Sequence, residues 1–283
     1  MKLEGAVVIV TGASRGIGQA IAVALGSAGA KVAVVARTAD APDEGLPGTV
    51  AATVDRVRAA GGEALAVTAD VGSEDDRRRL VDAVQHGLGD IDGLVNNAAF
   101  TVPGRPGRRP ARPAPGQRGT MPSFLDLPIE AVRRQFEVNL FACYRLMQLV
   151  LPGMVARRRG SVVNISSDAS RRPGEGPWPA DATGGGPWAY GGSKAALEHL
   201  TCAVAWEMAP HDVAVNALLP SRPVRTPGVE YFAPGLEAEE PDRFAAATLA
   251  LLGRPASAAT GQVLYSEDAL HPELGRRGWL ADV

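Results

Sequence analysis

Short runs of apolar residues, many of them β-branched, alternate with longer amphipathic stretches along most of this chain. The runs Val7-Val8-Ile9-Val10 and Val32-Ala33-Val34-Val35 are continuously apolar, which is typical of strands that are buried on both faces of a sheet. This pattern predicts strands at residues 6–10, 31–36, 64–68, 92–96, 161–165, 213–217 and 262–265.

Helical periodicity fills the intervals between these strands. Helices are predicted at residues 16–28, 49–60, 74–88, 128–156, 190–209 and 241–252. Regular alternation of strands and helices predicts an α/β fold, with a mostly parallel sheet covered by helices on both faces. We therefore expect a single doubly wound Rossmann domain over residues 1–283, with seven strands and with ligands bound outside the strands' carboxyl ends.

Composition mainly excludes classes of function. With 283 residues, of which 46% are apolar, the chain is long enough to bury one substantial core. A formal net charge of −2 gives no electrostatic argument for binding nucleic acid or an anionic membrane. No apolar stretch is expected to span a membrane, and the first residues do not resemble a secretory signal.

Cysteine and histidine are scarce in the chain. Cys143 and Cys202 both fall within predicted helices, and the four histidines are scattered. We therefore expect neither a disulfide framework nor a metal site. A reducing cytoplasm is the simplest setting for such a protein.

Two segments interrupt the alternation, as insertions near residues 101–122 and 168–188. Residues 103–122 hold five arginines among prolines and glycines, without an acidic residue. This composition predicts a loop, either a solvated insertion or a basic cover over an anionic substrate.

Residues 171–187 are also rich in proline and glycine and carry Trp178. This second loop precedes Tyr190 and is expected either to fold away from the active site or to cover it.

A glycine turn follows the first strand, in the sequence Thr11-Gly12-Ala13-Ser14-Arg15-Gly16-Ile17-Gly18. Glycines let the backbone approach an anion closely, and the start of the next helix offers free N–H groups and a favourable dipole. The spacing differs from the common Gly-x-Gly-x-x-Gly dinucleotide fingerprint, so a plain turn is the alternative. Its place after the first strand of an alternating pattern favours a pyrophosphate site.

Tyr190 and Lys194 lie four residues apart in a predicted helix, so their side chains share one face. A nearby cation stabilises phenolate, which lowers the pKa of a tyrosine towards the range useful for proton transfer. Spacing alone does not separate such a pair from two residues on a solvated helix face.

With the glycine turn, these residues make the chain resemble the short-chain dehydrogenase/reductase family over nearly its whole length. Further matches are Asp70-Val71 after the third strand, Asn96-Asn97-Ala98 after the fourth, Asn139 and Ser167. The resemblance implies a nicotinamide dinucleotide cofactor. The expected cofactor contacts are Gly12, Ser14, Arg15, Gly16, Ile17, Gly18, Arg37, Thr38, Asp70, Val71, Asn97, Tyr190, Lys194 and Thr226.

The resemblance also implies roles for four catalytic residues. Tyr190 would be the general acid/base, and Lys194 would lower its pKa and bind the nicotinamide ribose. Ser167 would stabilise the negative charge that develops on the substrate oxygen, with Ser166 as the alternative. Asn139 would hold a water molecule of the proton relay. In addition, Asp70 would contact adenine, Asn97 would brace the central strand, and Thr226 would meet the nicotinamide carboxamide.

The choice between the two nicotinamide cofactors is argued from charge. No carboxylate ends the second strand, where one would hold a ribose 2′-hydroxyl. Arg37, together with Arg15 of the glycine turn, is able to bind a 2′-phosphate through charge-assisted hydrogen bonds. We therefore expect NADP(H) to be preferred over NAD(H), unless both arginines only face solvent.

Several features depart from the family pattern. Tyr190 follows Ser167 by 23 positions, a longer interval than is usual. Ala99 replaces a customary glycine, and residues 220–226 replace the usual Pro-Gly turn. That form, with the long segment 38–49, resembles the hydroxysteroid dehydrogenase-like branch. The last strand lacks the usual closing Asp-Gly-Gly, which puts contacts made by the family's C-terminus in doubt.

The leading expectation is an oxidoreductase that transfers hydride between NADP(H) and a carbonyl or secondary alcohol. Alternatives are an isomerase or dehydratase on the same scaffold, or a catalytically silent nucleotide-binding protein. The substrate is not specified, because residues 227–240 and the loops that would line its pocket are irregular. Four aromatic residues would either line an apolar pocket or pack loops onto the body: Trp178, Trp188, Tyr231 and Phe232.

By the same resemblance, a homodimer or homotetramer is expected to form through helices 128–156 and 190–209. Six residues are candidates for that interface, with ordinary core contacts as the alternative: Leu140, Tyr144, Met147, Leu197, Leu200 and Trp206.

Overall fold

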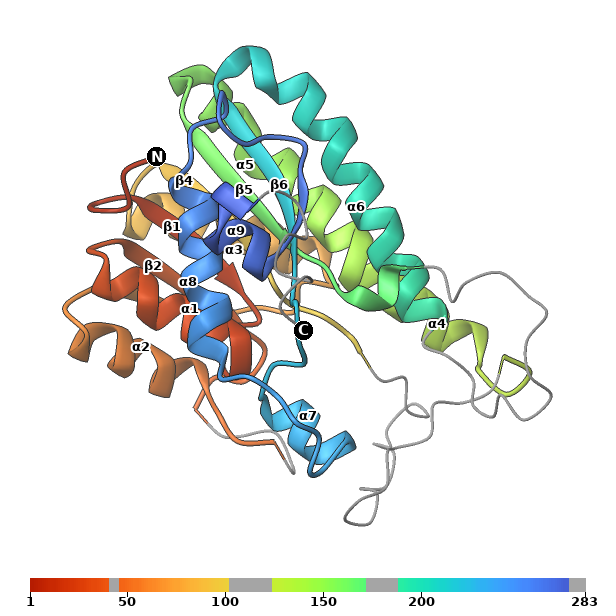
Figure 1. The fold of residues 1–283 in the computed structure, drawn as a ribbon. Coiled ribbons are helices and arrows are strands. Elements are labelled where there is room, and N and C mark those ends of the chain that lie inside the picture. Colours follow the sequence, from red (N-terminus) through yellow and green to blue (C-terminus); the bar gives the residue numbers. More distant parts are fainter. Residues whose placement is uncertain (41–45, 102–123, 172–187, 275–283) are drawn as a thin grey trace.

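The fold is given by a computed structural model that describes residues 1–40, 46–101, 124–171 and 188–274 (Figure 1). The two predicted loops, 103–122 and 171–187, fall outside this part of the chain, apart from Arg171. Trp178 lies outside it as well.

The core is one seven-stranded sheet in the order β3-β2-β1-β4-β5-β6-β7, and each adjacent pair of strands is parallel. Strand order reverses between β1 and β4, which in a doubly wound sheet places the ligand crevice at their carboxyl ends. The expected Rossmann-like fold is confirmed, and every predicted strand lies within two residues of its observed position. The strands are β1 Val7–Thr11, β2 Lys31–Ala36, β3 Glu63–Thr68, β4 Ile91–Asn96, β5 Gly160–Ile165, β6 Val213–Leu219 and β7 Val263–Tyr265.

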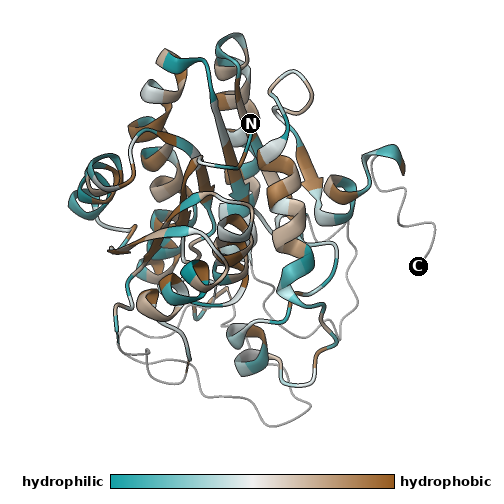
Figure 2. Ribbon diagram, turned by 90° about the vertical axis from the view of Figure 1, so that its left-hand side faces the viewer, coloured by the Kyte–Doolittle hydropathy of each residue, from teal (hydrophilic) through white to brown (hydrophobic). Residues whose placement is uncertain are grey.

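Helices cover both faces of the sheet, and alternate residues of the central strands belong to two separate cores. Val8 and Val10 of β1 pack with helices α1, α2 and α8, whereas Val7 and Ile9 pack with α3, α5 and α6. Figure 2 shows the apolar strands between these layers. The helices are α1 Gly16–Ser27, α2 Val50–Ala59, α3 Glu74–Gly87, α4 Ile129–Phe136, α5 Ala142–Arg157, α6 Trp188–Met208, α7 Pro227–Phe232, α8 Pro241–Gly253 and α9 Ser266–Leu270.

The helix predicted at residues 128–156 is not a uniform α-helix. A π-helical turn, η1 (Glu137–Phe141), separates α4 from α5. Such a turn inserts one residue into the helical repeat and often occurs at a functional site. Asn139 lies in the middle of this turn and is fully buried.

The continuous helix from Ile129 to Arg157 corrects one expectation from the sequence. Its 29 residues are long and apolar enough to cross a membrane by length and composition, although no such stretch was expected. Half of the apolar window is buried inside the fold, and Leu146 and Met154 belong to the core beneath the sheet. We interpret it as a core helix, which passes the same test.

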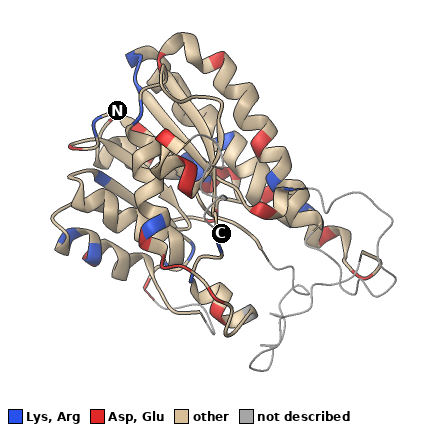
Figure 3. Ribbon diagram, viewed as in Figure 1, with Lys and Arg blue, Asp and Glu red and all other residues tan. Residues whose placement is uncertain are grey.

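Charged residues of both signs are interspersed on the face shown in Figure 3. This distribution agrees with the small net charge of −2, and nothing in the described surface points to a nucleic-acid partner.

Candidate active site

The glycine turn joins β1 to α1 and passes close to the end of β4. Gly12 has a φ of 66°, and a Cβ atom there would approach the Ala98 Cα to 2.8 Å. A Cβ on Gly18 would overlap the Gly12 carbonyl oxygen and the Asn97 side chain. Glycine is therefore required at both positions, because only glycine allows the turn to pack this closely against the end of β4 at the start of α1.

Asn97 fixes the geometry of this turn. Its Nδ2 atom donates to the Thr11 carbonyl at 2.8 Å and to the Gly12 carbonyl at 3.2 Å. In return, the Thr11 hydroxyl accepts hydrogen bonds from the backbone N–H groups of Asn97 and Ala98, each at 3.0 Å. The carboxyl ends of β1 and β4 are thus held together beside the glycine turn.

Arg15 and Arg37 both lie near the end of β2. Arg15 donates from Nη2 to the Thr38 hydroxyl at 3.2 Å and from Nη1 to the Leu46 carbonyl at 2.9 Å. Arg37 is exposed, and its charge helps to lower the pKa of Asp70. Two arginine residues therefore lie near the carboxyl end of β2.

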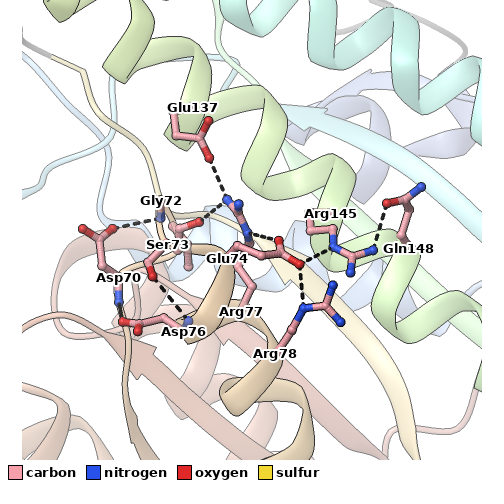
Figure 4. Close-up of polar contacts among 11 residues, drawn as sticks. Asp70, Gly72, Ser73, Glu74, Asp76, Arg77, Arg78, Glu137, Arg145 and Gln148 are labelled. Carbon is pink, nitrogen blue, oxygen red and sulfur yellow. Dashed lines mark hydrogen bonds and ion pairs between the residues drawn. The ribbon is translucent and has the colours of Figure 1, made fainter.

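Asp70 follows β3, and both of its carboxylate oxygens accept hydrogen bonds, of which Figure 4 shows the one from Gly72. Oδ1 accepts from the Gly72 N–H at 2.9 Å, and Oδ2 accepts from Arg134 Nη2 at 2.6 Å. Partial burial opposes ionisation, but these two hydrogen bonds and the positive charge hold the pKa of Asp70 below its ordinary value. Sequence reasoning did not find Arg134, because nothing in the pattern of α4 pairs it with a residue 64 positions earlier.

The other cofactor positions surround the same crevice. Ser14 is buried and Ile17 half-buried at the turn, while Val71 is buried behind Asp70. Thr226 begins α7, where its hydroxyl accepts from the Val229 N–H at 3.1 Å. A Cβ on Gly16 would approach the Thr226 methyl group to 3.1 Å, so Thr226 lies directly against the glycine turn.

Beside this crevice, an ion-pair cluster links α3 to the helix that carries Asn139 (Figure 4). Arg77 Nη1 donates to Glu137 Oε1 at 2.8 Å and to the Val71 carbonyl at 2.8 Å. Glu74 accepts from Arg145 Nε of α5 at 2.9 Å. The π-helical turn is therefore held from the nucleotide side of the sheet.

Asn139 connects that turn to helix α6. Its Nδ2 atom donates to the Ser193 hydroxyl at 3.0 Å, and Ser193 donates onward to the Tyr190 carbonyl at 2.7 Å. Its Oδ1 atom accepts from the Phe100 N–H at 2.8 Å. Both polar atoms of the Asn139 side chain thus form hydrogen bonds within the protein. The backbone carbonyl of Asn139 accepts from the Cys143 thiol at 3.5 Å.

The two serines after β5 have different partners. Ser166 is buried, and its hydroxyl donates to Glu198 Oε1 at 2.6 Å. Ser167 lies close enough to the Tyr190 side chain to lower the pKa of the phenol, and its hydroxyl accepts from the Ala169 N–H at 3.3 Å. Only Ser167 meets Tyr190, so the geometry favours the expected serine over its alternative.

Tyr190 and Lys194 lie on one face of α6, with the Lys194 Nζ atom 5.9 Å from the centre of the Tyr190 ring. Lys194 is 1% exposed and donates to the Ile165 carbonyl at 2.7 Å. Burial lowers the pKa of Lys194. Burial also raises the pKa of Tyr190, and this effect outweighs that of Ser167, which lowers it. The expected lowering of the Tyr190 pKa by Lys194 stays a prediction.

The residues expected at a subunit interface differ in exposure. Met147 and Leu197 are 1% and 0% exposed, so the alternative of a core contact holds for them, and Leu140 and Leu200 are half-buried. Tyr144 and Trp206 are 45% and 84% exposed on the outer sides of α5 and α6. Trp188 stacks at a tilt on Phe124, with ring centres 5.1 Å apart.

Among the described residues, no group of three or more histidine, cysteine, aspartate or glutamate side chains is placed to hold a metal ion. Cys143 is buried, which raises the pKa of its thiol to about 11.

Comparisons with known proteins agree with this geometry. The family model for short chain dehydrogenases matches residues 6–233. The chain is 31% identical over 275 residues to the 7alpha-hydroxysteroid dehydrogenase of Escherichia coli (strain K12), covering 93% of each protein. It is 30% identical to hydroxysteroid dehydrogenase-like protein 2 of Danio rerio, covering 96% of this chain and 59% of that relative.

Solved structures give the same result. A putative dehydrogenase from Xanthomonas campestris superposes with a TM-score of 0.79 at 29% identity, covering 96% of this chain and 91% of that one. A metagenomic short-chain oxidoreductase in complex with NADP has a TM-score of 0.71 at 29% identity, with 94% and 98% covered. A 7α-hydroxysteroid dehydrogenase complexed with NADH and 7-oxo glycochenodeoxycholic acid has a TM-score of 0.72 at 29% identity, with 93% of each covered.

Proposed function

Because the chain belongs to the short-chain dehydrogenase/reductase family of oxidoreductases, we propose that it transfers hydride between NADP(H) and a carbonyl or secondary alcohol substrate. The arrangement of Ser167, Tyr190 and Lys194 at the end of β5 is the observation that carries this proposal.

The described residues fit a nicotinamide dinucleotide. Gly12 and Gly18 let the turn pack closely against Asn97 and Ala98, and it leads into a 12-residue helix whose first N–H groups would bind the pyrophosphate. Ser14, Ile17 and Val71, with the glycines, would line the pyrophosphate and adenine positions. When bound, the nicotinamide supplies the hydride, and the protein supplies orientation and electrostatics.

Proton transfer to the substrate would be carried out by residues of this chain. The Ser167 hydroxyl lies close enough to Tyr190 to lower its pKa, so one substrate oxygen placed between the two side chains would accept from both hydroxyls. The raised pKa of Tyr190 keeps the phenol protonated, which suits donation to a carbonyl oxygen that gains negative charge. Lys194 would approach the nicotinamide ribose, and Asn139 would hold the relay water through its backbone carbonyl.

Preference for NADP(H) is proposed from charge. Arg15 and Arg37 lie at the end of β2, and residues 31–38 include no carboxylate that would hold a ribose 2′-hydroxyl. Known relatives bind either cofactor, one with NADP and one with NADH in their structures, so the arginines carry the argument.

The test is a survey of aldehydes, ketones and secondary alcohols in which the absorbance of the reduced nicotinamide is followed. We expect NADPH to be consumed with at least one carbonyl substrate, in proportion to product formed. Conversion of substrate without any change in that absorbance would instead identify an isomerase or dehydratase. Binding of NADPH without conversion of any compound would identify a catalytically silent protein.

We also propose a single domain over residues 1–283, a cytoplasmic location, and a homodimer or homotetramer. The exposed Tyr144 and Trp206 on neighbouring helices support the assembly. Light scattering of wild type and the Trp206→Glu variant tests it, since a charge in the interface would dissociate the oligomer.

A further inference from the structure

Helix α6 carries three polar residues spaced by four positions: Tyr190, Lys194 and Glu198. Residues four apart lie on one face of a helix, so these three side chains form a row along α6. Each member contacts a different residue of the consecutive stretch 165–167, which begins with the last residue of β5. The contacts are Tyr190 with Ser167, Lys194 Nζ with the Ile165 carbonyl at 2.7 Å, and Glu198 Oε1 with the Ser166 hydroxyl at 2.6 Å.

Glu198 is a buried carboxylate, 8% exposed. Its second oxygen, Oε2, forms an ion pair with Arg171 Nη2 at 3.2 Å. Arg171 also lies 5.9 Å from the centre of the Tyr265 ring, and the Tyr265 hydroxyl donates to Asp168 Oδ1 at 2.6 Å. A buried carboxylate is costly without partners, and Ser166 and Arg171 supply such partners to the two oxygens of Glu198.

The described residues include no ion-pair partner for Lys194. Its Nζ atom donates instead to the neutral carbonyl of Ile165. The titratable groups that face it are Cys143 from α5 and Tyr190 and Glu198 from α6, while β5 presents only backbone. Burial keeps the Cys143 thiol neutral at neutral pH. Glu198 is therefore the carboxylate in this set, and it opposes the lowering of the Lys194 pKa by burial.

We propose that Glu198 is a positioning residue for the acid/base pair. It holds Ser166, next to Ser167, against α6 and places a carboxylate one helical turn from buried Lys194. The guanidinium group of Arg171 forms an ion pair with that carboxylate and partly neutralises its charge. The functional meaning of this arrangement rests on the proposed function, but the charge relation itself does not require turnover.

The experiment uses the scarcity of lysine, since the chain has three: Lys2, Lys31 and Lys194. Protein labelled with ¹³C at the lysine ε-carbon gives few signals, and Lys194→Ala assigns one of them. The chemical shift of that signal is followed against pH in the full-length protein. Glu198→Gln keeps an acceptor for Ser166 but removes the charge, and Arg171→Gln removes the opposing charge. Glu207→Gln, at an exposed position of the same helix, is the matched control.

The two variants are expected to act in opposite directions. In Glu198→Gln, Lys194 titrates at a lower pH than in wild type, and in Arg171→Gln it titrates at a higher pH. If the substitutions only loosened the site, the pH at which Lys194 titrates would change in the same direction in both variants. Glu207→Gln leaves the titration unchanged. Coincident curves for wild type and Glu198→Gln overturn the proposal, and if that variant does not fold, an unchanged curve for Arg171→Gln overturns it.

Enzyme kinetics separate this proposal from the proposed function. If the wild-type protein reduces a carbonyl, the alkaline limb of its kcat/KM profile moves to lower pH in Glu198→Gln, whereas a merely structural role would lower activity at every pH alike. If no variant or wild type turns over any substrate, the proposed function fails. The lysine titration then still decides the role of Glu198.

Discussion

The Lys194 Nζ atom donates a hydrogen bond to the Ile165 carbonyl oxygen at 2.7 Å from a position that is 1% exposed. An ammonium group is thereby held at the end of β5, on the helix face that carries Tyr190. Its burial is unfavourable for the fold, since it lowers the Lys194 pKa. Such a cost is typical of a group retained for function rather than for stability.

Replacing Lys194 by methionine should therefore separate stability from function. The unfolded chain binds this proton more tightly than the folded protein, so wild-type stability rises with pH from the lowered pKa of Lys194 towards its ordinary value. Lys194→Met lacks that dependence and should be more stable at pH 7 by about 1 kcal/mol, with loss of turnover. Denaturant unfolding from pH 6 to 10 measures this, and a variant less stable than wild type at pH 7 would contradict it.

The two serines after β5 should differ in their effect on catalysis. Ser167 contacts Tyr190, whereas Ser166 is bound to Glu198. Because Ser167 stabilises negative charge on the substrate oxygen, Ser167→Ala should lower kcat by about 100-fold. Ser166→Ala serves as the matched variant and should lose less than about tenfold, as expected for a residue that acts through its neighbours. Equal losses of kcat in the two variants, measured in steady-state assays, would contradict the different roles of Ser167 and Ser166.

Cofactor preference should depend on Arg37. A carboxylate at this exposed position repels a 2′-phosphate and accepts a 2′-hydroxyl, so Arg37→Asp should weaken NADPH binding by about tenfold or more while NADH binding is kept. Arg56→Asp, on the exposed face of α2, controls for a general change of charge. Fluorescence titration with both cofactors gives the answer, and an unchanged preference would refute the assignment.

The ion pair between Asp70 and Arg134 should make acid stability depend on a residue of α4. The folded pKa of Asp70 is lowered, so its contribution to stability is present above the unfolded pKa and is lost as pH falls through the folded one. Both side chains are about one-third exposed, and solvent screening limits the effect of Arg134→Met at pH 7 to about 0.5 kcal/mol. The difference from wild type should shrink below about pH 4. Arg133→Met, at the exposed neighbouring position, is the control.

The strands were predictable because each is a short apolar run between turn residues, as in Val7-Val8-Ile9-Val10. α7 and α9, of six and five residues, were missed because they are too short for a helical period to show. The π-helical turn at Asn139 was also invisible, since one inserted residue changes little in a sequence pattern.

The site was predictable as a set of residue types but not as a network. The roles of Gly12, Asn97 and Tyr190 follow from a spacing that resembles a known family. The partners Arg134 and Glu198 depend on tertiary contacts between distant segments, which no local pattern encodes. Periodicity also failed to separate Met147 from Tyr144, because a core contact and a subunit contact are equally apolar in sequence.

Tyr190 is central to the account, and one comparison tests it most directly. Tyr190→Phe removes only the hydroxyl that would donate the proton, so turnover of NADPH with a reducible carbonyl should fall by at least about 100-fold. NADPH binding, measured by fluorescence on the same protein, should stay within about threefold of wild type. Tyr144→Phe, on the exposed side of α5, should change neither quantity. Near-normal turnover in Tyr190→Phe would contradict the proposed function.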